Sequence, residues 1–201
     1  PQRYILPGLL AAFSREYPGI TYAIKQFDSR GVVDAIISGG MDFGFVGSAA
    51  SYPELEMLKL CEDRLILITS CEGKFRKFKG DTVTWDQVRD ERFILREDGS
   101  ATRALFMKSL EQRGIDVKSI SVVASIENPD TIKQCVREGL GVAVVSERSA
   151  EEDIRLGLIR GYYISDLDLK RDFYFINHKN RVLNPVARAF RDFTAKYSQC
   201  L

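Results

Sequence analysis

The chain repeats one order of helices and strands, with an offset close to 100 residues. The patterns predict helix, strand, helix and strand at 4–17, 20–26, 29–38 and 42–47, and again at 101–113, 120–126, 129–138 and 142–146. The turns correspond too, since SGGMDFGFVGS at 38–48 aligns with EGLGVAVVSE at 138–147. Alternating strands and helices favour parallel sheets with right-handed crossovers. The sequence therefore predicts two similar α/β halves.

The repeat extends to one strand at the front of each half. Phe93–Leu95 is an apolar triplet that precedes the helix expected at 101–113. Its counterpart in the first half would have to lie ahead of Pro1. A continuous apolar run at 65–68 is typical of a strand buried on both faces. Residues 151–161 are charged and show no regular period, whereas Asn184-Pro185 opens a last helix.

The stretch that follows Phe93–Leu95 has the composition of an anion site. Gly99 permits a tight turn, and Ser100 occupies the expected N-cap of the next helix. Helix N-termini are partly positive and favour acidic residues, yet this first turn contains Thr102 and Arg103. Free N–H groups, two hydroxyls and a guanidinium suit a small anion. The alternative is that Ser100 only caps the helix and Arg103 only points to solvent.

Charge and length exclude several classes of protein. The 201 residues carry a formal charge of +1 and are 45% hydrophobic and 28% charged, which fits one or two globular domains. A nearly neutral chain does not indicate a general nucleic-acid surface. No apolar run approaches the roughly 20 residues that a membrane span needs, and no signal peptide opens the chain. We expect a cytoplasmic protein.

The metal-binding and catalytic residue types are sparse. The cysteines Cys61, Cys71, Cys135 and Cys200 form no CxxC pair, and His178 is the only histidine. A zinc site is not expected, and reduced thiols are. His178 lies in the polar stretch NHKNR, which indicates an exposed residue. We expect neither a metal nor a cofactor.

Ligands of open parallel sheets bind beyond the carboxyl ends of the strands, at helix N-termini. Two halves that face each other would form a cleft with such ends as its walls. The residues expected there are small, hydroxylic or amide-bearing and suit a compact polar ligand, often an anion. For each residue alone, a simple cap or turn explains the pattern as well. The residues expected in the walls of the cleft are Gln2, Ser29, Gly47, Ser48, Ser100, Thr102, Arg103, Asn128 and Ser146.

Five segments, in order, give the sequence a resemblance to a known family. They are YILPGLLAAFSREYPGI, VVDAIISGGMDFGFVG, REDGSATRALF, TIKQCVREGLGVAVVSE and NPVARAFRDF. Together they resemble the effector-binding domain of LysR-type transcriptional regulators over nearly the whole chain. The resemblance implies a type 2 periplasmic-binding-protein-like fold. Residues 1–69 plus 176–201 would form one subdomain and residues 70–175 the other, with crossings near Thr69-Ser70 and Phe175-Ile176.

The resemblance also implies a function. A small effector would bind between the subdomains, and the conformation of a tetramer on DNA would then change. DNA would be bound through an N-terminal winged helix-turn-helix that this chain does not contain. By position, the effector would contact the residues given above for the cleft, without Arg103. Dimers of the family would use the helices at 4–17 and 129–138.

Two departures from the family pattern affect the site. The Ser/Thr-rich segment that usually precedes Pro1 is missing, so part of the site is absent from this chain. Gly47 stands where many members have Thr, which puts that hydroxyl contact in doubt.

Two other functions fit the same fold. A periplasmic solute receptor is disfavoured by the missing signal peptide and the unpaired cysteines, and a helix-turn-helix encoded upstream of Pro1 would decide against it. An enzyme such as a dehydratase or deaminase is disfavoured because the chain has no GxSxG elbow, P-loop, dinucleotide fingerprint or histidine–carboxylate pair. We therefore expect an effector-sensing domain and not an enzyme.

Overall fold

The computed structural model describes residues 5–47 and 52–198. The chain divides into two compact units, unit 1 from residues 1–62 and 171–201 and unit 2 from residues 63–170. The chain crosses between the units within strands β2 (Leu55–Thr69) and β8 (Lys170–His178). Both crossings come several residues earlier than those expected at Thr69-Ser70 and Phe175-Ile176.

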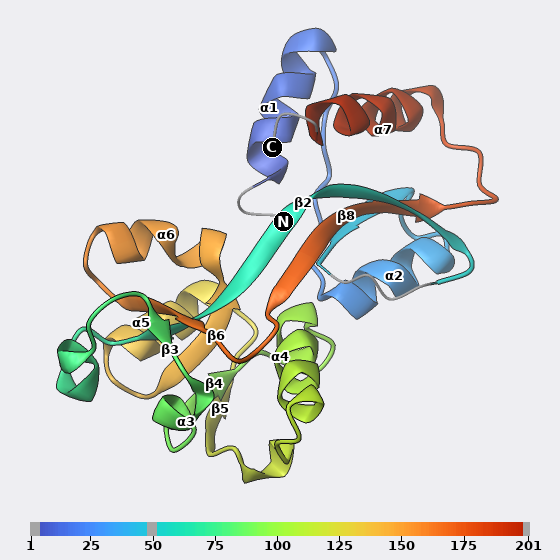
Figure 1. Ribbon diagram of the computed structural model, residues 1–201. Helices are drawn as coiled ribbons and strands as arrows, with labels where there is room; N and C mark the ends of the chain where they lie inside the picture. Colours follow the sequence, from blue (N-terminus) through green and yellow to red (C-terminus); the bar gives the residue numbers. More distant parts are fainter. Residues whose placement is uncertain (1–4, 48–51, 199–201) are drawn as a thin grey trace. The chain divides into compact units, whose positions relative to one another are not determined.

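Unit 1 has helices on both faces of its strands. Strand β1 (Phe43–Val46) runs antiparallel to β8, with Phe43 opposite Asn177. Helices α1 (Leu6–Glu16) and α7 (Pro185–Tyr197) share a core with Phe43 and Phe175, whereas α2 (Ser29–Ile37) packs with Val46 and Ile176 (Figure 1). Side chains on a strand alternate between faces, so each of these strands contributes to two cores.

Unit 2 is built on a sheet with the strand order β2-β6-β4-β5. Strand β4 (Phe93–Leu95) lies between β5 (Val122–Ser125) and β6 (Val142–Ser146) and is parallel to both. Strand β2 is antiparallel to β6 and to β7 (Arg160–Ile164). The short β3 (Thr82–Val83) pairs with β7 in parallel. The helices are α3 (Trp85–Val88), α4 (Ala101–Gln112), α5 (Pro129–Arg137) and α6 (Glu147–Arg155), with 3-10 turns at Gly73–Lys77 and Val117–Ser119.

The apolar run at 65–68 explains the layers of unit 2. Leu65 and Leu67 pack with α3 and α4, whereas Ile66 and Ile68 pack with α5 and α6. Each face of β2 is therefore buried, as the continuous run predicted. Helices α5 and α6 consequently lie on the same face of the sheet.

The corresponding turns of the two halves are present. Helices α2 and α5 are followed by Gly39 (φ 85°) and Gly139 (φ 78°), which adopt the left-handed conformation that ends a helix. Beside Gly39, Arg181 donates to the carbonyls of Ile36 and Ile37 at 3.1 Å each. The predicted helix ends are therefore confirmed here.

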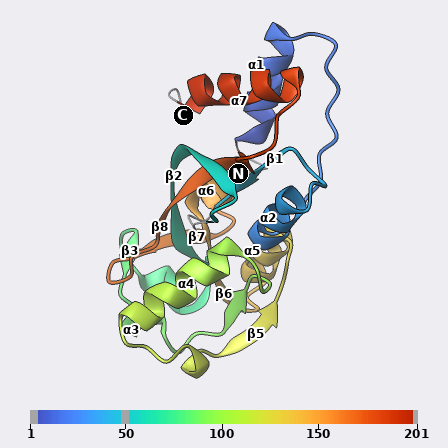
Figure 2. The same ribbon diagram turned by 90° about the vertical axis from the view of Figure 1, so that its right-hand side faces the viewer.

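The strand predicted at 20–26 is wrong. Residues 20–28 have no secondary structure and run from α1 to α2 as an extended segment (Figure 2). The side chain of Ile24 is 53% exposed, although the alternating pattern predicted a buried face. In unit 2 the equivalent strand β5 is held by β4. No strand in the described residues stands beside 20–26 to do the same, so alternation alone does not make a strand.

Other differences concern helices. Residues 147–155 form α6, although part of this stretch was expected to be irregular. The many charged residues of α6 lie on an exposed face, and Ala150 lies on the buried face. The apolar pattern at 129–138 predicts Ile132, Cys135 and Val136 as the buried face, whereas the buried residues of α5 are Ile132, Lys133 and Val136. The pattern after Asn184-Pro185 predicts an inward Val186, whereas this side chain of α7 is 49% exposed.

The aromatic core of unit 1 should carry much of that unit's stability. Phe13 is fully buried, with its ring 4.5 Å from Tyr17 and 5.0 Å from Phe190. Phe13→Ala should lower the free energy of unfolding by about 3–5 kcal/mol, because the cavity forfeits contacts as well as transfer energy. Urea unfolding measures this. Phe27→Ala, at an exposed position, should change it by about 0.5 kcal/mol or less. Equal losses for both variants would contradict the assignment of this core.

Candidate ligand-binding site

Three predicted site residues of unit 2 occupy equivalent positions. Ser100, Asn128 and Ser146 are the N-cap residues of α4, α5 and α6. These helices follow β4, β5 and β6, whose carboxyl ends lie at one edge of the sheet because the strands are parallel. The N-terminus of a helix is partly positive and presents N–H groups. These are the groups through which helix N-termini bind small anions.

The three caps differ in what their side chains do. The Asn128 carboxamide oxygen accepts the N–H groups of Asp130 at 2.8 Å and Thr131 at 3.3 Å. Neither Ser100 nor Ser146 caps its own helix through its side chain. The first N–H groups of α4 and α6 thus lack the usual side-chain acceptor from the N-cap. Ser100 occupies the N-cap position as expected, and its carbonyl accepts the first hydrogen bond of the helix from the Ala104 N–H at 2.9 Å, but its side chain does not cap α4.

The hydroxyl of Ser146 is directed to a buried carboxylate. It donates to Asp63 Oδ1 at 2.7 Å, and Asp63 is 5% exposed on β2. The two side chains meet because β2 and β6 pair with Leu65 opposite Ser146. Sequence analysis missed Asp63. The available signal was an acidic residue directly before the apolar run of a buried strand.

The turn between β4 and α4 has its charges paired internally. Arg96 makes two hydrogen bonds with Glu97, at 2.7 and 2.8 Å. Arg103 pairs with Asp98 at 3.0 Å and donates to the carbonyl of Arg96 at 3.2 Å. Gly99 (φ 91°) makes the turn possible. Arg103 therefore binds its own turn in this structure, and its contact with a ligand stays a prediction.

Thr102 lies beside Ser100 in the first turn of α4. Both residues are buried, at 7% and 4% exposure, although both are hydroxylic. Two small polar side chains therefore lie just beyond the end of β4.

The predicted site residues of unit 1 are only partly described. Gln2 and Ser48 lie outside the described residues. Ser29 is the first residue of α2 and follows Asp28, whose carboxylate caps the helix by accepting the Gly31 N–H at 2.7 Å. The cap is therefore Asp28, and the Ser29 side chain has no capping role there.

Gly47 follows β1 and is buried. A Cβ at this position would lie 3.0 Å from the ring of Phe173 and 3.3 Å from Arg171 Nη1. A residue such as Thr would therefore need its neighbours to shift. The structure gives a packing reason for Gly at 47, where the resemblance leads one to expect a hydroxyl.

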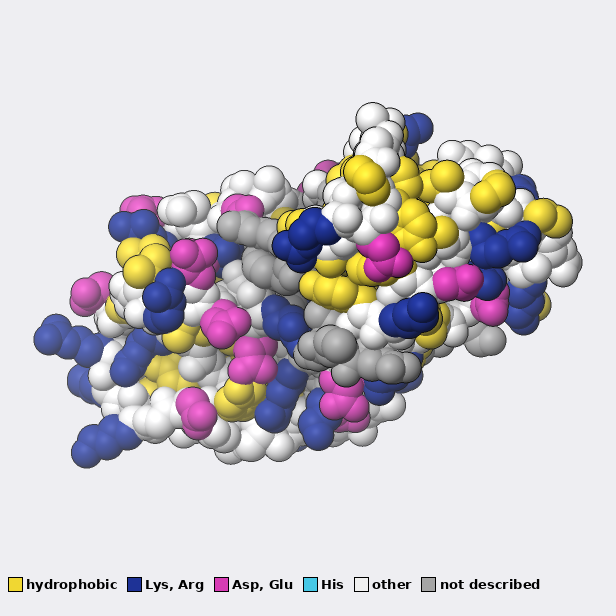
Figure 3. Space-filling view, turned by 90° about the horizontal axis from the view of Figure 1, so that it is seen from above, with side chains coloured by type: hydrophobic (Ala, Val, Ile, Leu, Met, Phe, Trp, Pro, Cys, Tyr) yellow, Lys and Arg dark blue, Asp and Glu magenta, His cyan; other side chains and the backbone are white. Residues whose placement is uncertain are grey.

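A groove lies elsewhere in unit 1, between α1 and α7. It encloses about 700 Å³ and is lined by Tyr17, Phe193 and Tyr197 together with charged residues such as Glu16 and Arg188. Hydrophobic side chains gather on the surface over these helices (Figure 3). None of the predicted site residues that the structure describes lines this groove.

Within the described ranges, no three His, Cys, Asp or Glu residues are grouped to hold a metal ion. Cys61, Cys71 and Cys135 form no disulfide bond with one another, and Cys200 lies outside these ranges. The ring of His178 accepts the Asn180 N–H through Nδ1 at 3.2 Å, a local turn contact. None of the helices in these ranges is long and apolar enough to cross a membrane.

The side chain of Tyr163 contacts the start of α6. The Tyr163 hydroxyl donates to Glu147, the first residue of that helix, and the guanidinium of Arg64 lies 4.1 Å from the centre of the Tyr163 ring. The hydrogen bond to Glu147 is the main cause that raises the pKa of Tyr163 above the ordinary value of 10.0, and burial of the phenol is the second cause. The protonated phenol is thus the form that the folded state prefers.

This shift predicts how stability depends on pH. A pKa raised by folding contributes stability in full below pH 10.0, and the contribution is lost as the pH rises through the raised pKa. Tyr163→Phe should be less stable than the wild type near neutral pH and should lose less stability above pH 10.0. Urea unfolding on both sides of that pH measures it. Parallel pH profiles of the two proteins would contradict the role of this hydroxyl.

Two α/β units joined through β2 and β8, with helix N-termini at the ends of parallel strands in unit 2, have the periplasmic-binding-protein-like fold. The chain belongs to the LysR substrate binding domain family, whose model matches residues 1–199. Both the predicted fold class and the predicted family are therefore confirmed.

Two relatives of this chain are named as transcriptional regulators. The chain is 31% identical over 197 residues to an uncharacterized HTH-type transcriptional regulator, MJ0300, of Methanocaldococcus jannaschii, covering 98% of this chain and 65% of the relative. It is 28% identical over 192 residues to a probable RuBisCO transcriptional regulator of Cyanophora paradoxa, covering 94% and 59%. The family and these relatives are transcriptional regulators and not enzymes, which confirms that prediction.

The match is to part of each relative. The chain is also 30% identical over 190 residues to a protein named phosphonates import ATP-binding protein PhnC, of Anaeromyxobacter dehalogenans, covering 94% of this chain and 38% of that protein. The chain thus spans 38% to 65% of the length of these three relatives.

Solved structures confirm the fold. The effector binding domain of QuiR in complex with shikimate has a TM-score of 0.87 at 18% identity, covering 98% of this chain and 92% of that one. The regulatory domain of Synechocystis CcmR in complex with 2-PG has a TM-score of 0.85 at 22% identity, with the same coverage.

Proposed function

We propose that this chain is the effector-sensing domain of a LysR-type, DNA-binding transcriptional regulator, and that its effector is a small polar anion. The observation that carries the proposal is the pair of helix N-termini, α4 and α6, that their own serines do not cap. A negatively charged ligand there would accept N–H groups and interact favourably with the helix dipoles.

The effector contacts that we propose come from both units. In unit 2 they are Ser100, Thr102, Asn128 and Ser146, with Arg103 able to add charge if it leaves Asp98. In unit 1 they are Gln2, Ser29, Gly47 and Ser48. Support for anionic character also comes from the neighbours, since QuiR was solved with shikimate, which carries a carboxylate.

The effector acts by shifting populations. A ligand that binds one conformation of the domain more tightly favours that conformation, by as much as its affinities for the two states differ. In the full-length regulator, a tetramer bound to DNA through N-terminal helix-turn-helix domains would transmit the change. The neighbours include full-length CbnR in complex with its target DNA. Such a regulator works in the cytoplasm, where its DNA is.

A thermal-shift screen tests the ligand. Sulfate, shikimate and 2-PG are added to the 201-residue chain, and a true effector raises the melting temperature with the logarithm of its concentration. Ser100→Ala with Thr102→Ala should weaken its binding about tenfold or more, through loss of two hydroxyl contacts. The control is Ser198→Ala, distant from these caps in sequence and located after α7. Unchanged binding by the double variant would place the site elsewhere.

We further propose a dimer formed through α1 and α5. On α1 the small residues Pro7, Gly8 and Ala11 are exposed. The groove between α1 and α7 lies beside this helix. Small residues permit close approach of a second helix. The wild type should elute as a dimer in size-exclusion chromatography with light scattering, and Ala11→Arg as a monomer with an unchanged far-UV circular dichroism spectrum. A dimer that tolerates Ala11→Arg would rule out this face of α1.

A further inference from the structure

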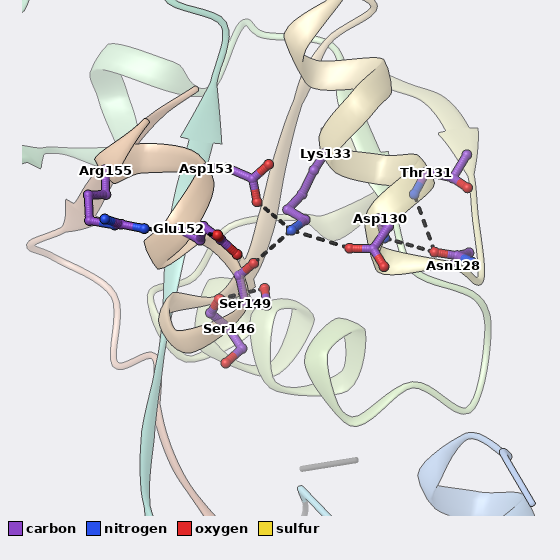
Figure 4. A network of polar contacts seen from close by, with 9 residues as sticks. All are labelled: Asn128, Asp130, Thr131, Lys133, Ser146, Ser149, Glu152, Asp153 and Arg155. Carbon is purple, nitrogen blue, oxygen red and sulfur yellow. Dashed lines mark hydrogen bonds and ion pairs between the residues drawn. The ribbon is translucent and has the colours of Figure 1, made fainter. Parts of the chain in front are cut away.

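Unit 2 contains a buried lysine that no part of the proposed effector site uses. Lys133 lies on α5 and is 6% exposed. Its Nζ lies 2.9 Å from the carbonyl oxygen of Ser149, 2.5 Å from Asp153 Oδ2 and 3.2 Å from Asp130 Oδ1 (Figure 4). Asp130 is on the same helix, whereas Ser149 and Asp153 are on α6. The ammonium group therefore joins two helices.

A lysine is an unfavourable choice for this position. Its neighbours on the inward face of α5, Ile132 and Val136, pack into an apolar core. The second turn of a helix is also near its partly positive end. Burial of an ammonium group costs free energy that paired carboxylates offset, and an apolar residue of similar size often serves stability as well. The position of Lys133 thus indicates a role in geometry more than in stability.

The contacts of Lys133 continue to both of the nearby helix caps. Asp130 donates its N–H to the Asn128 side chain. On the other side, the Ser149 hydroxyl donates to the Ser146 carbonyl at 2.7 Å, and the Ser146 hydroxyl reaches Asp63. An uninterrupted series of polar contacts therefore links the N-cap of α5 to the N-cap of α6 (Figure 4).

The sheet does not provide such a link directly. Strands β5 and β6, which precede α5 and α6, are not neighbours, because β4 lies between them. The start of α5 is thus separated from the start of α6 by a whole strand. A side-chain contact between the helices is a direct way to fix the spacing of their N-termini.

We propose that Lys133 is a positioning residue, which holds the N-termini of α5 and α6 at the separation that an effector needs between Asn128 and Ser146. The inference rests on the proposed function only for the purpose of the spacing, which is to bind an effector. The spacing itself is a property of the protein without ligand. Loss of the ammonium group frees the two caps to move relative to each other.

Amide NMR spectra and hydrogen exchange of the ligand-free chain test the positioning. Lys133→Met keeps an unbranched side chain of nearly the same length and removes the charged group. We expect altered shifts and faster exchange at the first turns of both α5 and α6, including the Asn128 side-chain amide. Lys133→Arg, which can reach the same oxygens, should restore much of the wild-type pattern.

The matched control is Val136→Ala, one turn further along the same helix. Val136 is fully buried, so the variant loses stability through a cavity, but it leaves the polar contacts in place. A merely structural Lys133 would behave like Val136, with general destabilisation and no selective effect at the two caps. That result, or changes confined to residues next to position 133, would overturn the proposal.

Binding is then measured by calorimetry with shikimate and with 2-PG. Where the wild type binds a probe, Lys133→Met should weaken it by about tenfold, as loss of an outer contact that orients a ligating residue does, and Val136→Ala by less than about twofold. Equal weakening by both variants would contradict the role of Lys133. If the wild type binds neither probe, that result counts against the proposed effector class, and the spectra of the ligand-free variants still decide the positioning role.

Discussion

Parallel pairing of β4 with both of its neighbours is the constraint on which unit 2 depends. Because β5 and β6 flank β4 in the same direction, their carboxyl ends share an edge with that of β4. The helix that follows each strand must begin at this edge. Three N-caps with positive partial charge are therefore brought together by backbone hydrogen bonds alone, before any side chain takes part.

Side chains then make the three helix starts different. Asn128 satisfies two N–H groups of its own helix, whereas the Ser146 hydroxyl is engaged by Asp63 and the Ser100 hydroxyl does not cap α4. The basic residues of the β4–α4 turn are paired with neighbouring acids. The attraction for an anion at this edge thus comes mainly from helix ends rather than from free cationic side chains.

The repeat predicted from the sequence holds where both halves contain the partners that it needs. Helix ends at Gly39 and Gly139 match. The halves differ at 20–26, because a strand requires a neighbour to receive its hydrogen bonds, and period-2 alternation says nothing about the neighbour. Helix α6 was not predicted for a different reason, because its few inward residues gave no clear period.

The sequence by itself determined the α/β class, most of the elements and the residues at the N-caps, because periodicity and capping are local properties of the chain. It also identified the family, through ordered motifs that cover nearly all of the chain. Only the tertiary structure decided what those caps do. Asp63 meets Ser146, and Lys133 meets Ser149 and Asp153, across sequence separations that no local pattern encodes. Burial of charge in these contacts depends on which strands and helices become neighbours, and that is a property of the folded chain.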